Sequence, residues 1–125
     1  CACRGTAGFA HVSCLAEQAK ILIAEVEENN LSDKVGNERW LRWERCGLCE
    51  QDYHGVVACA LGWACWKTYL GRPEVDGVRL SAMRALGLGL FSAFHHEEAL
   101  SVQEAELALL RRLGAPEETI LNTQN

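Results

Sequence analysis

Proline, basic charge and long apolar runs are all scarce in this sequence. Only 2 of its 125 residues are proline, so little prevents the formation of long uninterrupted helices. The 12 Lys and Arg residues are outnumbered by 17 Asp and Glu residues, which gives a formal net charge of -5. Proteins that bind nucleic acid usually present a basic face, and this charge balance offers none. We therefore expect no nucleic-acid partner.

The apolar stretches are short for a membrane protein. The long charge-free stretch extends over residues 55–66, whereas a helix needs about 20 apolar residues to cross a bilayer. The sequence also has no charged start followed by an apolar core, which is the pattern of a signal peptide. These absences predict an intracellular protein, cytoplasmic or nuclear, with no membrane partner within this chain.

Cysteine, by contrast, is abundant, with 7 residues in a chain of 125. A secreted scaffold held by disulfides would favour an even number of cysteines and a signal peptide, and neither is present. Four of the cysteines form two close pairs, which favours metal binding in a reducing compartment. The cysteine content therefore predicts a metal site rather than a disulfide framework.

Apolar residues at helical spacing dominate the rest of the chain. A polar loop is expected over residues 29–37, and a linker over residues 74–77. Gly114 is placed to end the last helix, and Pro116 suits the first turn of a further one. The predicted helices cover residues 15–28, 55–70, 78–94 and 97–113.

Six residues have the types and the spacing of zinc ligands. Zinc prefers four tetrahedral ligands, drawn from cysteine thiolate and histidine imidazole. Two ligands that are one or two residues apart can reach one ion from a tight turn, and three such pairs occur before residue 50. A glycine inside the last pair lets the backbone bend round the metal. The candidate ligands are Cys1, Cys3, His11, Cys14, Cys46 and Cys49.

The run CACRGTAGFAHVSCL resembles the middle of a RING-CH (RING-variant) zinc finger. That family has a Cys-x-x-Cys pair, then Cys-x-Cys, seven residues, His-x-x-Cys, a loop and a final Cys-x-x-Cys. Cys1, Cys3, His11 and Cys14 have this spacing, and the segment CGLCEQDY that begins at Cys46 is similar to the family's end. A PHD finger shares the ligand order and tolerates a long loop, so it remains an alternative.

The resemblance implies a cross-brace of two zinc ions. In it, the Cys1 and Cys46 pairs would complete one site, while His11 and Cys14 would be half of a second site. The rest of that second site would lie upstream of Cys1. The expected fold class is therefore mainly α with a small zinc-stabilised cross-brace module and helical hairpins. Residues 1–73 would be the zinc-binding module with its following helix, and residues 74–125 a helical segment.

RING-CH fingers hold a ubiquitin-conjugating enzyme and supply no catalytic residue. The resemblance thus implies a RING-type ubiquitin ligase that acts through proximity and orientation. The sequence contains no Ser-His-Asp arrangement and no phosphate-binding loop, and zinc with four protein ligands has no open position for water. We therefore predict no catalytic residue and no cofactor besides Zn²⁺. A non-catalytic interaction scaffold and a PHD-like reader of a peptide tail are the alternatives.

The spacing of Leu86-Gly87, Leu90 and Ala99 resembles the packing positions of a tetratricopeptide repeat, and the tail from Ala99 resembles the kinesin-light-chain version. Such repeats stack and present a concave surface, which implies a protein or peptide partner. Antiparallel helices are expected, with a close backbone approach at Gly87 and with Leu107 or Leu110 in the interface. An ordinary helical hairpin is the alternative.

The remaining cysteines, histidines and tryptophans are interpreted as structural. The five-residue gap between Cys59 and Cys65 does not place both on one helical face, and they are expected to be small buried apolar residues. His54, His95 and His96 are expected in solvated turns. The tryptophans are expected to pack together, because a small zinc module needs aromatic surface for a core. They are Trp40, Trp43, Trp63 and Trp66.

Overall fold

The structure is a computed structural model that describes residues 11–114 of the chain. In that range it contains five α-helices and one short 3-10 helix, and it has no β-strand. A single isolated antiparallel bridge joins Arg45 to Asp52. The prediction of a mainly α protein is therefore confirmed. Among the described helices, none combines the length and the apolarity that crossing a membrane would require.

The first helices form a hairpin. Helix α1 extends over Val12–Glu28, and helix α2 over Asp33–Trp40, followed by the 3-10 helix η2 at Leu41–Trp43. Ser32 begins α2, because its hydroxyl oxygen accepts a hydrogen bond of 3.3 Å from the amide of Val35. The loop predicted over residues 29–37 is therefore too long. Its second half is helical, since the Ser32 cap overrides the polar composition.

The three later helices lie close to their predicted positions. Helix α3 covers Gly55–Tyr69, α4 covers Gly77–Ser92 and α5 covers His96–Arg112, so each end lies within two residues of its prediction. Asp76 caps α4 by accepting a hydrogen bond of 2.8 Å from the amide of Val78. Helical periodicity was sufficient here because each helix is long.

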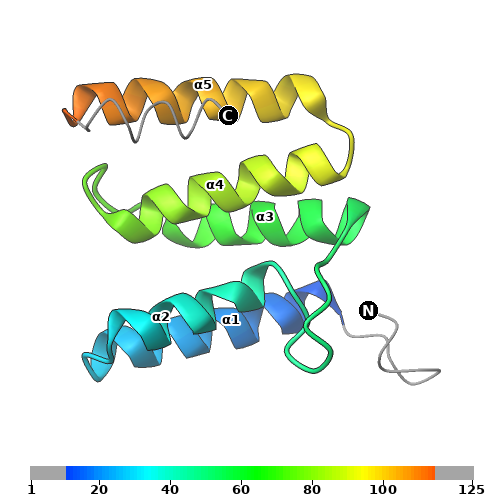
Figure 1. Ribbon diagram of the computed structural model, residues 1–125, viewed down its shortest axis with the longest axis vertical. Helices are drawn as coiled ribbons and strands as arrows, with labels where there is room; N and C mark the ends of the chain where they lie inside the picture. The colour runs from blue at the N-terminus through cyan, green and yellow to red at the C-terminus, as the bar shows by residue number, and fades with distance from the viewer. Residues whose placement is uncertain (1–10, 115–125) are drawn as a thin grey trace.

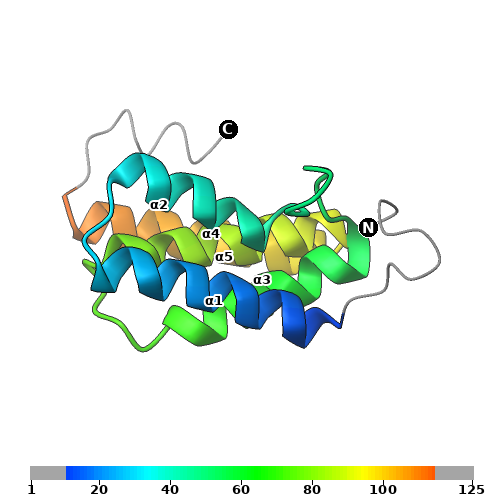
Figure 2. The same ribbon diagram turned by 90° about the horizontal axis from the view of Figure 1, so that it is seen from below.

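The helices are arranged in successive antiparallel pairs. Figure 1 shows α1 and α2 on one side, α3 and α4 in the middle, and α5 on the far side of α4. The view in Figure 2, turned by 90°, shows that all five helices run roughly along the same direction. The segment between η2 and α3 hangs at the end of the molecule where α1 begins (Figure 1). That segment carries the last cysteine pair.

Helices α3 and α4 approach each other so closely that their backbones touch. A Cβ atom added at Gly62 of α3 would lie 2.9 Å from the carbonyl oxygen of Ala85 in α4. The same atom added at Gly89 of α4 would lie 2.5 Å from the carbonyl oxygen of Ala58 in α3. Neither position has room for a side chain, because the opposing atoms belong to a helix backbone that cannot turn away.

Helices α4 and α5 are antiparallel, as predicted, but they do not approach so closely. Leu86, Leu90 and Leu110 are buried between neighbouring helices, at 3%, 1% and 4% exposure. A Cβ atom added at Gly87 would meet only the Val102 side chain of α5, at 3.6 Å. The predicted close backbone approach at Gly87 is therefore wrong, because the Val102 side chain separates the two helices there.

One aromatic cluster packs at the centre of the first three helices. The ring of Tyr69 lies 5.5 Å from that of Trp40 and 6.2 Å from that of Trp43. Trp63, by contrast, is 39% exposed, and the ring of Trp66 lies under the guanidinium group of Arg79 in α4. The prediction that all four tryptophans pack together is therefore wrong. Trp66 still packs, partly buried, against the same core, whereas Trp63 lies largely at the surface of α3.

The main core crosses the predicted boundary between residues 73 and 74. Its buried residues include Ile23 from α1, Leu61 and Cys65 from α3, and Ala82 and Ala85 from α4. Arg72 adds to this connection through an ion pair of 3.6 Å with Asp76, and on its own side of the boundary it donates two hydrogen bonds of 2.7 Å to Glu27. Those hydrogen bonds lower the pKa of the Glu27 carboxyl. The two predicted segments therefore share one core.

Candidate metal centre

The predicted ligands fall into two groups in the structure. Cys1 and Cys3 lie outside the described residues. His11 and Cys14 lie at the start of α1, and the last cysteine pair lies in the segment between η2 and α3. Within residues 11–114, no three or more His, Cys, Asp or Glu side chains gather closely enough to hold a metal ion. The described part of the chain thus contains ligand pairs rather than a full ligand set.

A short hairpin positions the pair Cys46 and Cys49. The amide of Cys46 donates a hydrogen bond of 2.9 Å to the carbonyl oxygen of Gln51, which closes the hairpin around the two cysteines. Beside this bond, the guanidinium of Arg45 forms an ion pair of 3.3 Å with Asp52 across the isolated bridge. These contacts hold the turn from both of its ends.

In the turn between the two cysteines, one backbone amide is directed at sulfur. The amide of Leu48 donates a hydrogen bond of 3.4 Å to the Sγ atom of Cys46. The amide of Glu50 donates one of 3.0 Å to the carbonyl oxygen of Cys46, and Glu50 itself has a left-handed φ of 61°. An N–H group directed at sulfur favours the charged thiolate, which is the form that binds metal. The chain therefore bends round the sulfur of Cys46 and not away from it.

Burial distinguishes this pair from the cysteines of α3. Cys46 is 2% exposed and Cys49 is half-buried, although the turn itself lies at the surface. Cys65 is fully buried in the helical core, where burial and then the charge of Glu44 raise the pKa of its thiol. Cys65 is therefore a neutral core residue, as predicted. It lacks the turn and the amide donor that accompany Cys46.

The second pair is exposed. His11 is the residue before α1, and Cys14 lies in its first turn, where its amide donates a hydrogen bond of 3.0 Å to the His11 carbonyl oxygen. Both side chains face solvent. The structure does not bring this pair together with Cys46 and Cys49. The cross-brace implied by the resemblance also assigns the two pairs to different zinc ions.

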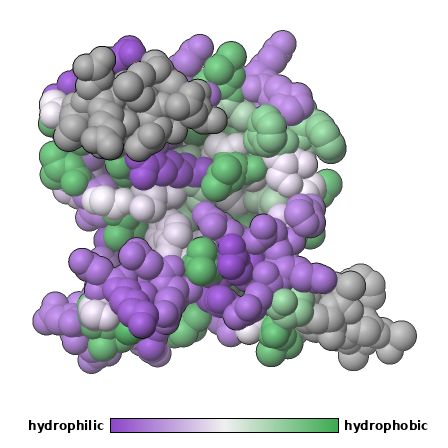
Figure 3. All heavy atoms as spheres, viewed as in Figure 1, coloured by the Kyte–Doolittle hydropathy of each residue, from purple (hydrophilic) through white to green (hydrophobic). Residues whose placement is uncertain are grey.

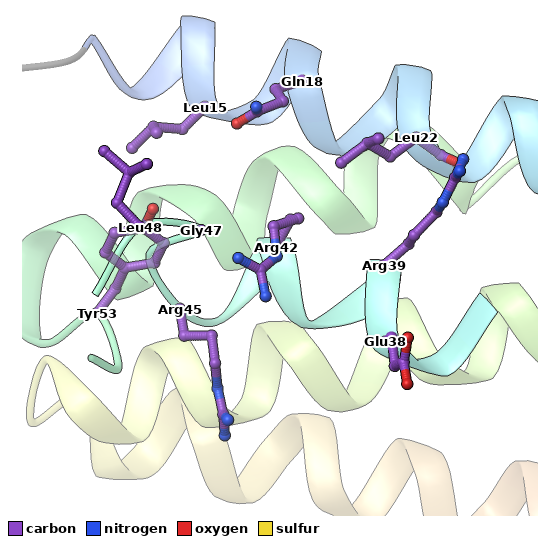
Figure 4. Close-up of a pocket in the computed structure, with 10 residues that line it drawn as sticks. All are labelled: Leu15, Gln18, Leu22, Glu38, Arg39, Arg42, Arg45, Gly47, Leu48 and Tyr53. Carbon is purple, nitrogen blue, oxygen red and sulfur yellow. The ribbon is translucent and has the colours of Figure 1, made fainter. Parts of the chain in front are cut away.

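A pocket of about 340 Å³ lies beside the cysteine turn. Its walls come from α1, from the α2–η2 segment and from the turn itself, as Figure 4 shows. Leu15, which follows Cys14, and Leu48, which lies between Cys46 and Cys49, both line it. The pocket therefore adjoins both described ligand pairs.

Three arginines line this pocket, and the sequence interpretation missed them. Arg39, Arg42 and Arg45 occur at every third position, in α2, in η2 and just after η2, and all three line the pocket. That spacing was the available signal.

Comparison with known proteins gives no further guide, since no protein-family model, no curated protein and no solved structure matches this chain.

Proposed function

We propose that residues 1–53 form a zinc-binding module of the RING-CH type, which recruits a protein partner. The observation that carries the proposal is the hydrogen bond from the Leu48 amide to the Sγ atom of Cys46, inside a turn that Glu50 closes with a left-handed backbone. A buried cysteine that merely fills space needs neither feature. A metal-bound thiolate is stabilised by the amide donor, which offsets its charge and orients it, and the left-handed residue closes the turn that presents it.

The donor set fits zinc. Cys46 and Cys49 would supply two thiolates, and Cys1 and Cys3 would supply the other two. Bound zinc would contribute folding free energy and no open coordination position, so its role would be structural. His11 and Cys14 would contribute to the second ion of a cross-brace.

Cobalt(II) titration tests the donor set. Cobalt that is bound tetrahedrally by thiolates absorbs visible light strongly, and it reports the ligands without any need for activity. We expect this absorption in the reduced 125-residue chain, and we expect Cys46→Ala and Cys49→Ala each to abolish it. Cys59→Ala is the matched control, because Cys59 lies on α3, and it should leave the absorption unchanged. Equal absorption in all variants would overturn the proposed ligand assignment.

The partner we propose is a ubiquitin-conjugating enzyme. The support is Leu48, which lies between the two cysteines and is 70% exposed. A large apolar side chain on a rigid, metal-stapled turn is suited to insertion into a partner surface. The chain would act as a ubiquitin ligase by holding the conjugating enzyme in position, without catalytic residues of its own.

An autoubiquitination assay with a panel of conjugating enzymes tests this activity. We expect activity in a chain that carries a further Cys-x-x-Cys pair upstream of Cys1, and none in the 125-residue chain. In the active chain, Leu48→Ala and His11→Ala should each abolish the activity, while Leu100→Ala on α5 should not. Activity that survives both Leu48→Ala and His11→Ala would overturn the ligase proposal.

The second candidate is a non-catalytic scaffold that binds a partner through its helical part. A specific observation favours it: Leu88, Phe91 and Phe94 are 60%, 62% and 81% exposed where α4 passes into α5. Figure 3 shows apolar residues gathered at this end of the two helices. Tetratricopeptide-like stacking of a further helical element would cover such a surface. Binding of a partner that survives Leu48→Ala and is lost with Phe91→Ser would favour this candidate.

A further inference from the structure

The three arginines that line the pocket differ in their partners. Arg39 forms an ion pair of 3.0 Å with Glu25 and donates a hydrogen bond of 3.1 Å to the carbonyl oxygen of Leu22. Arg45 forms an ion pair of 3.3 Å with Asp52. Arg42 has no ion pair and no hydrogen bond to any residue in the range 11–114. Its guanidinium is the only one of the three whose charge is left unbalanced there.

The position of Arg42 is fixed by the cysteine turn. A Cβ atom added at Gly47 would lie 2.8 Å from Nη1 of Arg42 and 3.5 Å from its Cδ atom. The side chain therefore lies against the backbone of the turn, and Figure 4 shows it extending from η2 toward Gly47. Arg42 is partly buried there. A partly desolvated cation without a counter-ion is costly, and an anion beside it would offset that cost.

Apart from Glu38, the remaining walls are apolar or neutral. Leu15 and Leu22 from α1 are half-buried, and Leu48 projects from the turn at the opposite wall. These leucines suit an aliphatic side chain, and Gln18 offers an amide between them. The volume of the pocket is at the lower end of the range of small-ligand sites, about 300 to 1,000 Å³. It is large enough for a short peptide segment.

The charge of the lining favours a monoanion. One guanidinium group is uncommitted, and its planar fork matches the two oxygens of a carboxylate. Glu38 is the one carboxylate in the lining, and it lies toward the α2 end of the pocket, apart from Arg42 in the view of Figure 4. A phosphate dianion would meet only one free positive charge and this acidic residue. A carboxylate is the better match.

We propose that this pocket binds a peptide carboxylate that is adjacent to an aliphatic side chain, with Arg42 as the anchor for the carboxylate. The carboxylate would come from an acidic side chain or from a peptide C-terminus. The inference goes beyond the proposed function, because peptide binding in this pocket requires neither a zinc ion as a ligand of the peptide nor a ubiquitin-conjugating enzyme. Each of the two proposals can therefore fail while the other stands.

Three dipeptide probes test the proposal and separate the two sources of the carboxylate. They are acetyl-Glu-Leu-amide, acetyl-Ala-Leu with a free C-terminus, and the neutral acetyl-Gln-Leu-amide. Binding to the full chain, ¹⁵N-labelled and supplied with zinc, is followed by NMR at the amides of Gly47 and Leu48 and at the Nε–H group of Arg42. At least one acidic probe should have an affinity at least about tenfold higher than that of the neutral probe, because it gains a charge-assisted hydrogen bond.

Variants of the pocket locate the interaction. Arg42→Gln should weaken binding of the acidic probe by about tenfold or more, since the fork is lost. Arg111→Gln on α5 removes the same charge outside the pocket and should leave the affinity within about twofold, because exposed distant charges are screened. Gln18→Glu places a carboxylate in the lining and should weaken binding while leaving Arg42 in place. This last variant keeps the test decisive if Arg42→Gln perturbs folding.

Several results would overturn the proposal. Equal binding of the acidic and neutral probes would identify a purely apolar pocket. Tighter binding of inorganic phosphate than of any acidic probe would identify a phosphate site instead. Undiminished binding to both Arg42→Gln and Gln18→Glu, or no binding of any probe at millimolar concentration, would show that Arg42 anchors no carboxylate.

Discussion

The α3–α4 pair and the cysteine turn are held together in different ways. In the helix pair, backbone meets backbone at Gly62 and Gly89, and the surrounding core is apolar. In the cysteine turn, a few hydrogen bonds hold a surface loop whose apolar residue Leu48 faces solvent. Apolar packing can stabilise the first region by itself. The second is a surface turn held by a few hydrogen bonds, and the proposed zinc would be its main source of stability.

The largest expected effect comes from removing a ligand of the cysteine turn. Cys49→Ala should abolish metal binding and with it folding free energy on the order of 10 kcal/mol that structural zinc supplies. We expect the turn and the start of α1 to lose their order while α3, α4 and α5 stay helical. Amide hydrogen exchange of the wild type and of Cys49→Ala, each in the presence of zinc, measures the protection of both regions in one experiment. Uniform loss of protection across α3–α5 would show that the two regions are not independently held.

The helix pair is tested by adding one methyl group. Gly89→Ala should destabilise the protein by about 2–3 kcal/mol, because the new Cβ atom clashes with the backbone carbonyl of Ala58, which cannot move aside. Gly87→Ala is the matched control two residues away on α4, where the nearest contact is ordinary. It should be neutral or stabilising by about 0.5–1 kcal/mol through helix propensity. Chemical denaturation of both variants gives the comparison, and similar effects would contradict it.

A smaller, favourable effect is expected in the turn itself. Glu50 has a left-handed φ of 61°, a conformation that glycine adopts without strain. Glu50→Gly should therefore stabilise the zinc-loaded turn by about 0.5–1 kcal/mol, or equivalently tighten metal binding severalfold. Competition with a chromophoric zinc chelator measures this affinity. Weaker zinc binding in the glycine variant would show that Glu50 contributes something besides its backbone conformation.

The smallest expected effect concerns the ion pair between Glu27 and Arg72, which joins α1 to the segment after α3. Hydrogen bonds from Arg72 lower the pKa of Glu27 from its usual value of 4.5, so the stabilisation is complete above that pH. It is lost as the pH falls through the lowered pKa. Because the pair is exposed, we expect less than about 0.5 kcal/mol. Chemical denaturation between pH 6 and pH 3 measures this. The free energies of unfolding of the wild type and of Glu27→Gln should converge at the acid end.

Local sequence patterns predicted most of the helices and the cysteine turn, but they did not predict contacts between segments that are distant in the sequence. The long helices followed from apolar spacing, and the turn at Cys46 followed from the gap between two cysteines. The short helix at Asp33–Trp40 did not, because it is polar and depends on the cap at Ser32. The touching backbones at Gly62 and Gly89 were also missed. A helix that is apolar on several sides does not reveal which face meets its neighbour.

The pocket illustrates the same limit. The periodic spacing of Arg39, Arg42 and Arg45 was visible in the sequence, but their partners were not. Only the folded chain places Glu25 of α1 against Arg39 and Asp52 against Arg45, and so leaves Arg42 unbalanced. A charge pattern within one segment can indicate a basic side, but the distinction between the three arginines requires the tertiary structure.

Native mass spectrometry tests the central claim, that Cys46 and Cys49 hold zinc, most directly. The reduced 125-residue chain, purified with zinc present, should carry one zinc ion, as expected for one complete set of four ligands. The Cys59→Ala variant should carry the same, and Cys46→Ala and Cys49→Ala should carry none. A folded helical chain without zinc, or zinc that remains bound in both ligand variants, would contradict the account.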